Sequence, residues 1–205
     1  MKRILSLLCG IMLGLSSQLF SQQFQGGLIG GLVGSQVAGD LYSGYNKVGV
    51  MGGGYIALQL SDKFSLQLEM EYIQKGSRHN ADPDIPTDIT YKLNLDYLEL
   101  PLLLRYRVMN QMELEAGLAY AALISHKESQ DGQSMANYRP GFNSVNLSFV
   151  GGISYTYKEK YRFNLRTDNS LETIRKGTFP GMVRRLDNKY GQFNDILVIS
   201  LFYKL

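Results

Sequence analysis

Hydrophobic and polar residues alternate one by one along much of this chain, a pattern that indicates β-strands rather than helices. The segment DYLELPLLLRYRV, from Asp96 to Val108, is the clearest example. One face of this strand carries Leu98, Leu100, Leu102, Leu104 and Tyr106. The other face carries Glu99, Pro101, Leu103, Arg105 and Arg107. The first face needs an apolar neighbour, whereas the second tolerates charge.

Seven further segments complete a prediction of eight strands. They are 24–36, 48–60, 64–73, 112–124, 145–157, a strand that opens at 161–166, and 193–205. Between the strands, short turns at 61–63, 108–111 and 158–160 alternate with long polar connections at 37–47, 76–90, 127–143 and 170–192. The three turns and both chain ends therefore lie at one end of an up-and-down antiparallel sheet.

The size of the apolar stripes decides which way they face. An eight-stranded barrel has an interior only just wide enough for its side chains, and these stripes would overfill it. The opposite faces carry small, polar and charged residues that fit such an interior, and only Asp195 places a charge on an apolar stripe. The sequence therefore predicts an all-β fold, an eight-stranded antiparallel up-and-down transmembrane β-barrel with its apolar stripes facing lipid. Closure leaves no strand edge unpaired in the membrane.

Aromatic residues gather at the turn end of the outward stripes, where an interfacial girdle is expected because a phenol hydroxyl can reach water while its ring stays in the apolar layer. The predicted girdle is Phe64, Tyr106, Tyr157, Tyr161, Phe163 and Tyr203.

Charged residues on the opposite faces are expected to point into the barrel. The predicted interior network is Glu69, Glu71, Glu99, Arg105, Glu113, Glu115, Arg162 and Arg166, with Lys204 as a further candidate. Buried charges need partners, so structural ion pairs are favoured over a proton path or a ligand site. The interior is then too full for a solute channel. Pro101 lacks an N–H group and predicts a bulge or a local break in its strand.

Residues 1–21 predict a cleaved signal peptide, which leaves residues 22–205 as the barrel domain. MKR is followed by the apolar run ILSLLCGIMLGL and the polar stretch SSQLFS. The run is shorter than the roughly 20 residues that span a bilayer as a helix. Cys9, the only cysteine, lies in this run, so the mature domain has no thiol for a disulfide, a nucleophile or zinc. Loss of Lys2 and Arg3 lowers the formal charge from +3 to +1, which gives no reason to expect nucleic acid.

Two candidate sites for chemistry lie near the predicted loops. Ser125, His126 and Glu128 stand at the loop end of a strand, where a lipid-modifying hydrolase could work. Neighbours in a strand point to opposite faces, however, and no nucleophile motif supports them. The loop HNADPDIPTD (79–88) carries three aspartates without the spacing of a calcium loop. We therefore expect no catalytic residue, cofactor or metal site.

The last long connection contains a cluster of basic residues, Arg175, Lys176, Arg184, Arg185 and Lys189. Such a cluster suits anionic lipopolysaccharide headgroups or a partner protein, although solvation alone also explains it.

Several segments together resemble the PorT-type outer-membrane barrels: YLELPLLLRY (97–106), EYIQKGS (71–77) and GGLIGGLVGSQVAGD (26–40). The chain's end, LVISLFYKL, looks like the terminal strand signal that barrel-assembly machinery recognises, with Leu205 in place of the commoner phenylalanine. The resemblance implies a link to type IX secretion.

We therefore expect an integral protein of the outer membrane of a Gram-negative bacterium, with periplasmic termini. Its expected partners are outer-membrane lipid, lipopolysaccharide, the barrel-assembly machinery and secretion or envelope proteins. A non-enzymatic structural, surface-interaction or accessory role is favoured. A lipid-modifying enzyme and a small-solute conduit are the alternatives.

Overall fold

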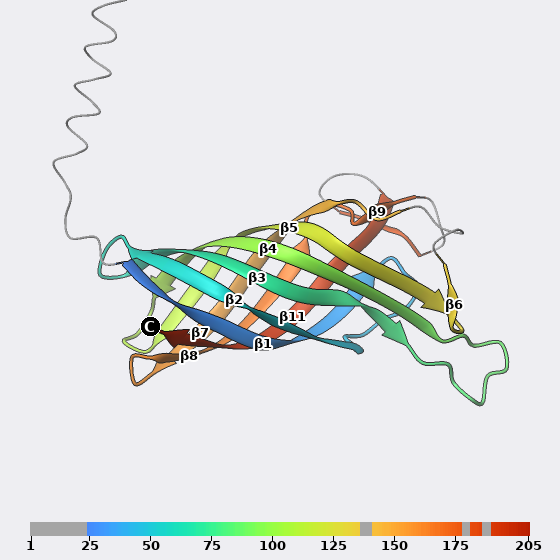
Figure 1. Cartoon of the computed structure of the whole chain (residues 1–205), viewed down its shortest axis with the longest axis horizontal. Helices are drawn as coiled ribbons and strands as arrows, with labels where there is room; N and C mark the ends of the chain where they lie inside the picture. The colour runs from blue at the N-terminus through green and yellow to red at the C-terminus, as the bar shows by residue number, and fades with distance from the viewer. Residues whose placement is uncertain (1–23, 136–140, 178–180, 186–189) are drawn as a thin grey trace, which may run out of the picture.

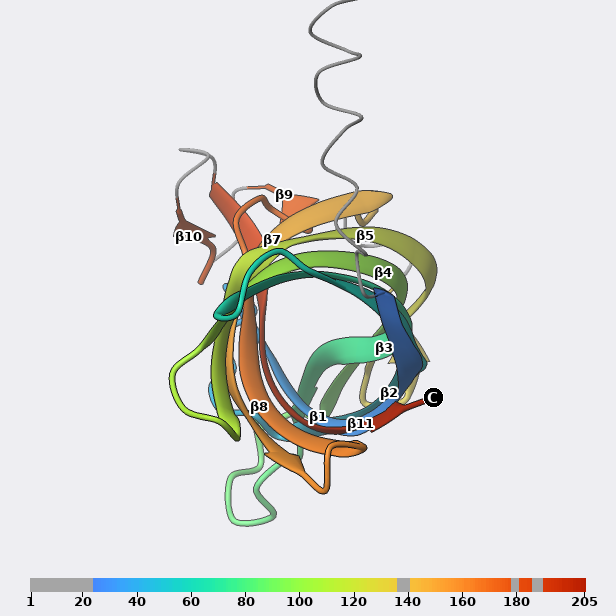
Figure 2. The same cartoon turned by 90° about the vertical axis from the view of Figure 1, so that its left-hand side faces the viewer.

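The computed structural model of the chain describes residues 24–135, 141–177, 181–185 and 190–205. Its long strands form a closed antiparallel barrel, which confirms the predicted fold (Figures 1 and 2). The eight barrel strands are β1 (Phe24–Ala38), β2 (Lys47–Gln59), β3 (Phe64–His79), β4 (Tyr91–Arg107), β5 (Met112–Gln130), β7 (Val145–Tyr157), β8 (Tyr161–Ser170) and β11 (Tyr190–Lys204). Each pairs with the next in this order, and β1 pairs with β11 to close the ring.

Three short strands lie at the loop end of the barrel. They are β6 (Gln133–Ser134), β9 (Arg175–Lys176) and β10 (Val183–Arg184). β6 pairs with β5, while β9 and β10 pair with the first residues of β11. No helix among the described residues is long and apolar enough to cross a membrane.

Glycine lets the first strand close against the last. A Cβ atom on Gly31 would lie 2.7 Å from the carbonyl oxygen of Ile199 and 2.8 Å from the Cβ of Ser200. A larger residue at this position would push β11 away from the seam, because both neighbours belong to that strand. The sequence leaves the faces of the glycine-rich first strand unassigned, and the close approach of β1 and β11 explains why glycine is used there.

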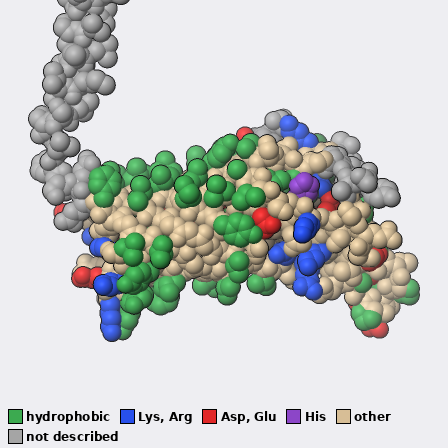
Figure 3. Space-filling model, viewed as in Figure 1, with side chains coloured by type: hydrophobic (Ala, Val, Ile, Leu, Met, Phe, Trp, Pro, Cys, Tyr) green, Lys and Arg blue, Asp and Glu red, His purple; other side chains and the backbone are tan. Residues whose placement is uncertain are grey.

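The two faces of β4 divide as the alternation predicts. The outward side chains of Leu98, Leu100, Leu102, Leu104 and Tyr106 are between 37% and 49% exposed. The inward side chains of Glu99, Leu103 and Arg105 are 1%, 0% and 5% exposed. Apolar side chains accordingly cover much of the outer surface of the barrel (Figure 3).

Beyond Leu98, towards the loop end, the apolar stripe of β4 changes face. β3, β4 and β5 all continue past the predicted strand ends, so the connections predicted at 76–90 and 127–143 are shorter. In β4 from Tyr91 to Tyr97, the fully buried side chains are Tyr91, Leu93, Leu95 and Tyr97. Neighbouring residues of a strand point to opposite faces, and Tyr97 and Leu98 are neighbours. The apolar stripe of β4 therefore faces the interior up to Tyr97 and the exterior from Leu98 onwards.

The irregularity expected at Pro101 is a break without a bulge. The pairing of β4 with β3 is interrupted beside Pro101, but the register is the same on both sides of the gap. The pairing with β5 continues through Pro101. A bulge occurs elsewhere, at Ile124 of β5, where the register shifts between Asp96 and Tyr97. An interrupted ladder suits a residue that has no N–H group to donate.

The alternation of the last strand places Phe193 on the lipid-facing stripe, and this prediction is wrong. Phe193 is fully buried. The guanidinium of Arg185 lies 4.9 Å from its ring and forms an ion pair with Asp195 at 2.5 Å. The connection predicted at 170–192 is therefore partly β-structure that packs over the loop end of β11. The one charge on an apolar stripe is thereby paired.

Candidate functional site

Arg166 stands at the centre of an ion-pair cluster inside the barrel. From β8, its Nη1 lies 2.8 Å from Oε2 of Glu69 on β3, and its Nε lies 3.1 Å from Oε1 of Glu115 on β5. The same Nε donates to the side-chain oxygen of Asn164 at 3.0 Å. The three charged side chains are almost fully buried. The cluster therefore ties three strands together across the interior.

Gln67 links two further arginines to this cluster. Its side-chain oxygen accepts hydrogen bonds from Arg105 (3.1 Å) and Arg162 (2.8 Å). Arg105 also forms an ion pair with Glu113. Within the described part of the chain no carboxylate pairs with Arg162, whose guanidinium lies 4.1 Å from the centre of the Phe202 ring. Arg162 is therefore held by an amide and an aromatic face.

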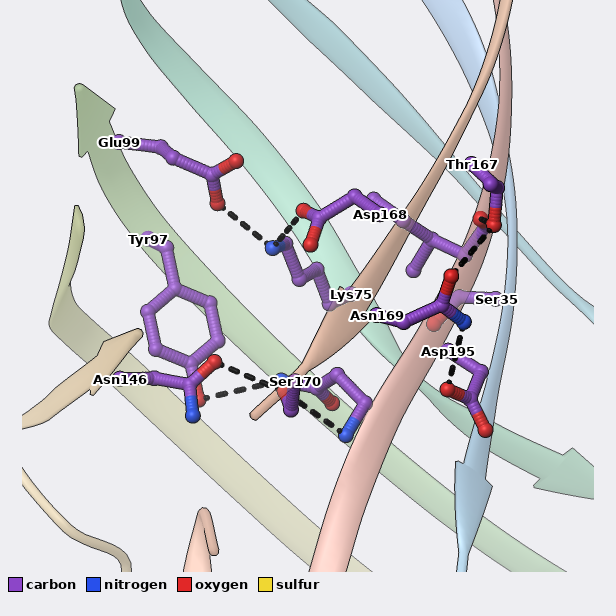
Figure 4. A network of polar contacts seen from close by, with 12 residues as sticks. Ser35, Lys75, Tyr97, Glu99, Asn146, Thr167, Asp168, Asn169, Ser170 and Asp195 are labelled. Carbon is purple, nitrogen blue, oxygen red and sulfur yellow. Dashed lines mark hydrogen bonds and ion pairs between the residues drawn. The ribbon is translucent and has the colours of Figure 1, made fainter. Parts of the chain in front are cut away.

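Lys75 joins two carboxylates nearer the loop end of the barrel. Its Nζ lies 2.6 Å from Oε2 of Glu99 and 2.6 Å from Oδ2 of Asp168. Figure 4 shows the ammonium between the two carboxylates, which come from β4 and β8. The ring of Tyr97 lies 5.6 Å from the same ammonium. One buried cation thus serves two buried anions.

Glu71 forms no ion pair with any described residue, although it is buried. It stands directly opposite Glu99 in the pairing of β3 with β4, and its Oε2 has no hydrogen-bond partner. Like charges placed opposite each other oppose strand pairing. Glu71 is therefore the weakest point of the interior network.

Lys75 and Asp168 belong to the interior network but are not among the residues predicted for it. The predicted third strand ends at residue 73 and the seventh is assigned only to residue 166, so both residues lie just outside the predicted strands. Both lie two residues beyond those limits, at inward-facing positions. Carrying the alternation one step further along each strand would have placed both side chains inside the barrel.

An apolar plug, made of Tyr91, Leu93, Leu95, Tyr97 and Ile174, fills the barrel at the loop end. Tyr42, from the connection after β1, stacks on Tyr91 with a ring distance of 4.9 Å. The hydroxyl of Tyr91 donates to Glu128 at 2.8 Å, and Glu128 also pairs with Arg175 at 2.5 Å. The inward face thus carries ion pairs among apolar side chains in the middle of the barrel and mainly apolar side chains at this end, a division that the sequence does not predict.

A vestibule of about 370 Å³ opens at the turn end. Tyr55, Arg105, Arg162 and Lys204 line it together with residues of the turns. Because Arg105 and Arg162 also belong to the ion-pair layer, the inner wall of the vestibule is made by the network itself. Lys204 therefore lies at the mouth of the interior rather than within the ion-pair layer.

The six aromatic residues expected in the girdle lie at the turn end of the outer face with exposed side chains. Two contacts join them across strands. The rings of Phe64 and Tyr106 are 5.0 Å apart, and those of Tyr161 and Tyr203 are 5.5 Å apart. Such cross-strand aromatic pairs stabilise a sheet by packing.

The arrangement at Ser125, His126 and Glu128 does not form a hydrolase triad. Glu128 binds Arg175 and Tyr91, and the His126 ring rests against Phe142 at 5.3 Å. No hydrogen bond joins Ser125 to His126, both of which the structure describes.

The loop HNADPDIPTD is held by its own carboxylates. Asp88 accepts hydrogen bonds from the N–H of Asp82 at 2.7 Å and from Nε2 of His79 at 3.0 Å. These hydrogen bonds, the first above all, lower the pKa of Asp88 below its usual value. The N–H of Asp84 is bound to the carboxylate of Asp82 in turn. Across the described residues, no group of three or more His, Cys, Asp or Glu could hold a metal ion.

Two of the five residues in the basic cluster expected in the last long connection are paired with carboxylates, while Lys176 and Arg184 are exposed. Arg175 is buried and paired with Glu128, whereas Arg185 is paired with Asp195 on the outer face. Lys189 lies outside the described residues. Ion pairing therefore removes two of the charges that such a cluster would offer to a ligand.

Comparison with known proteins agrees with the architecture. The sequence pattern of the outer membrane protein beta-barrel domain matches residues 7–174. No curated protein matches the chain.

Among solved structures, similar ones include Ail, the attachment invasion locus protein of Yersinia pestis, with a TM-score of 0.50 and 10% identity over 89% of this chain and 99% of that one. The neisserial surface protein NspA also has a TM-score of 0.50, with 10% identity over 89% of this chain and 97% of that one. OprG of Pseudomonas aeruginosa is 16% identical over 89% of this chain and 94% of that one, with a TM-score of 0.42. At such identities the likeness concerns the fold alone.

Proposed function

We propose that this chain, which belongs to the outer membrane protein beta-barrel domain family, is a non-enzymatic barrel that acts through its outer surface and its external connections. In this proposal its termini and short turns face the periplasm and the long connections face the outside of the cell. The two ends of the barrel then meet different partners.

The filling of the interior is the observation that carries this proposal. From the turn end, a path along the axis meets the Arg166 cluster, then the Lys75 ion pairs, and then the apolar plug. Each layer is made of buried side chains that contact one another across the barrel. A filled barrel of eight strands offers little room for a substrate or a solute. Function is therefore left to the outside of the molecule.

The conduit alternative has a direct test. Full-length protein inserted into planar lipid bilayers is expected to give no conductance steps above the level of the bare bilayer. The filled interior requires this result, because hydrated ions cannot pass a buried ion-pair layer and an apolar plug. Discrete steps of stable size, absent from protein-free bilayers, would contradict the proposal.

We further propose a PorT-type accessory role in envelope assembly or type IX secretion. The support is the Tyr-Leu-Glu-x-Pro-Leu-Leu segment at 97–103. Crosslinking in the native host followed by purification of the barrel is expected to recover envelope or secretion proteins. Recovery of lipid alone would favour a free-standing surface protein. An altered lipid A in a deletion strain would favour the enzymatic alternative.

A further inference from the structure

Three basic side chains lie together on the outer face, beyond the apolar band towards the loop end. Arg78 of β3 and Lys92 of β4 are direct partners in the strand pairing. Lys127 of β5 is paired with Asn94, the next outward residue of β4 after Lys92. All three cations are exposed. Figure 3 shows Lys and Arg side chains gathered in this part of the surface, beside the apolar band.

This basic patch, Arg78, Lys92 and Lys127, has no counter-ion in the described part of the protein. Among the described residues, no ion pair involves any of its three members. On the outward face of β4, Asp96 lies between Lys92 and the apolar band that begins at Leu98. Its carboxylate accepts a hydrogen bond from the hydroxyl of Tyr72 at 3.0 Å. Like charges placed directly opposite each other destabilise a strand pair. An external anion would remove this cost.

The position of the patch fits the headgroup layer of the outer leaflet. Lys92 stands six residues beyond Leu98, the last exposed leucine of β4. Six residues span about 20 Å along a strand, or about 14 Å in height at the usual tilt. A lysine side chain can bend back towards the membrane by several ångströms. The ammonium groups therefore reach the level at which lipid phosphates lie.

A groove of about 400 Å³ adjoins the patch and could hold part of a headgroup. Lys92 and Lys127 line it together with Asn94, Ser129 and His126. Glu128 also lines the groove, where its carboxylate is paired with Arg175. The lysine, asparagine, serine and histidine side chains provide the N–H and O–H donors that phosphate oxygens need. The positive charge of the patch, its height in the membrane and its hydrogen-bond donors thus all suit a phosphate-bearing lipid headgroup.

We infer that the basic patch binds the phosphate groups of lipopolysaccharide in the outer leaflet. This inference rests on the proposed orientation, in which the connections face the outside of the cell. Binding would anchor the barrel laterally among its lipids and would fix the height of β3, β4 and β5 in the membrane. The sequence predicts such a contact in the last long connection, whereas the structure brings three unpaired cations together on these three strands.

The test titrates the full-length protein, folded in neutral detergent micelles, with bisphosphorylated lipid A and with dephosphorylated lipid A. The wild type is expected to bind the bisphosphorylated form at least tenfold more tightly. The triple variant Arg78→Gln, Lys92→Gln, Lys127→Gln is expected to lose about 100-fold in affinity, since each cation near a membrane surface contributes about fivefold. The single variant Lys127→Gln is expected to lose about fivefold, and it serves if the triple variant does not fold.

The matched control removes three exposed cations from the turn end, in the variant Lys63→Gln, Lys158→Gln, Lys160→Gln. Its affinity for lipid A should change by less than about twofold, because these lysines lie at the opposite end of the barrel from the patch, and charge interactions over such a distance are largely screened. The inference is overturned if the wild type does not distinguish the two lipids, or if the patch variant and the control bind equally. Heat-modifiable gel migration reports folding separately, and bilayer conductance tests the filled barrel separately, so the failure of one proposal is distinguishable from the failure of the other.

Discussion

Replacing Lys75 with methionine is expected to lower the free energy of unfolding by about 3–5 kcal/mol. Methionine has a similar length but leaves the buried carboxylates of Glu99 and Asp168, each now 2.6 Å from the ammonium, without a cation. With Glu71 directly opposite Glu99, three carboxylates would then share this layer. Removing one partner of a buried ion pair costs far more than the pair contributes.

The measurement is a urea titration of protein refolded into lipid vesicles, followed by heat-modifiable migration on a gel. Lys63→Met, at an exposed turn position, is the control and should change stability by less than about 0.5 kcal/mol. Adding Glu99→Gln and Asp168→Asn to Lys75→Met should restore part of the loss, because the two carboxylates that Lys75 neutralises are then replaced by neutral amides. A Lys75→Met barrel as stable as the wild type would show that the ammonium does not neutralise this layer.

Replacing Leu102 with arginine is expected to cost about 2–4 kcal/mol, the penalty for a cation near the middle of the lipid face of a barrel. Leu102 is exposed on the outer stripe of β4, with four residues of the stripe around it that are also apolar. An arginine there would have to expose its charge to acyl chains or deform the bilayer to reach water. The same vesicle-based titration measures the loss.

Leu60→Arg is the matched control, since Leu60 is exposed at the turn end of the barrel. Near the membrane interface the same change should cost only about 0–1 kcal/mol. Equal costs at Leu60 and Leu102 would mean that the outer stripe does not lie in a membrane of the expected thickness. A neutral effect at both positions would point to water around the barrel.

The alternation of residues predicts the barrel well because each strand has only two faces and the apolar face is long. The spacing of the connections gives the up-and-down order for the same reason. The change of face between Tyr97 and Leu98 could not be predicted in this way. An apolar side chain is stabilised both by lipid outside the barrel and by the plug inside it. The sequence alone therefore does not say which of the two it contacts. Only the extension of β3 to β5 beyond the membrane decides the matter.

The sequence also does not predict which charged residues pair with each other inside the barrel. Arg166 and Glu69 are far apart in the chain, and their contact depends on the tilt and stagger of the strands, which alternation does not encode. Lys75 and Asp168 were missed because polar residues at strand ends look like loop residues. Phe193 was misplaced because the preceding segment, which includes Arg185, covers the face on which alternation puts it. In each case the local sequence fits two placements of the side chain equally well, and a tertiary contact decides between them.

The orientation of β4 is the claim on which the rest depends, and a spin-label scan from residue 98 to residue 105 tests it most directly. The only cysteine, Cys9, lies in the predicted signal peptide, so single cysteines can be introduced one at a time into an otherwise thiol-free domain. In lipid vesicles, labels at 98, 100, 102 and 104 should be the more accessible to oxygen, which concentrates in the acyl layer. Labels at 99, 101, 103 and 105 should be shielded. Higher oxygen accessibility at 99, 101, 103 and 105 than at 98, 100, 102 and 104, or accessibility that does not alternate from residue to residue, would contradict the account.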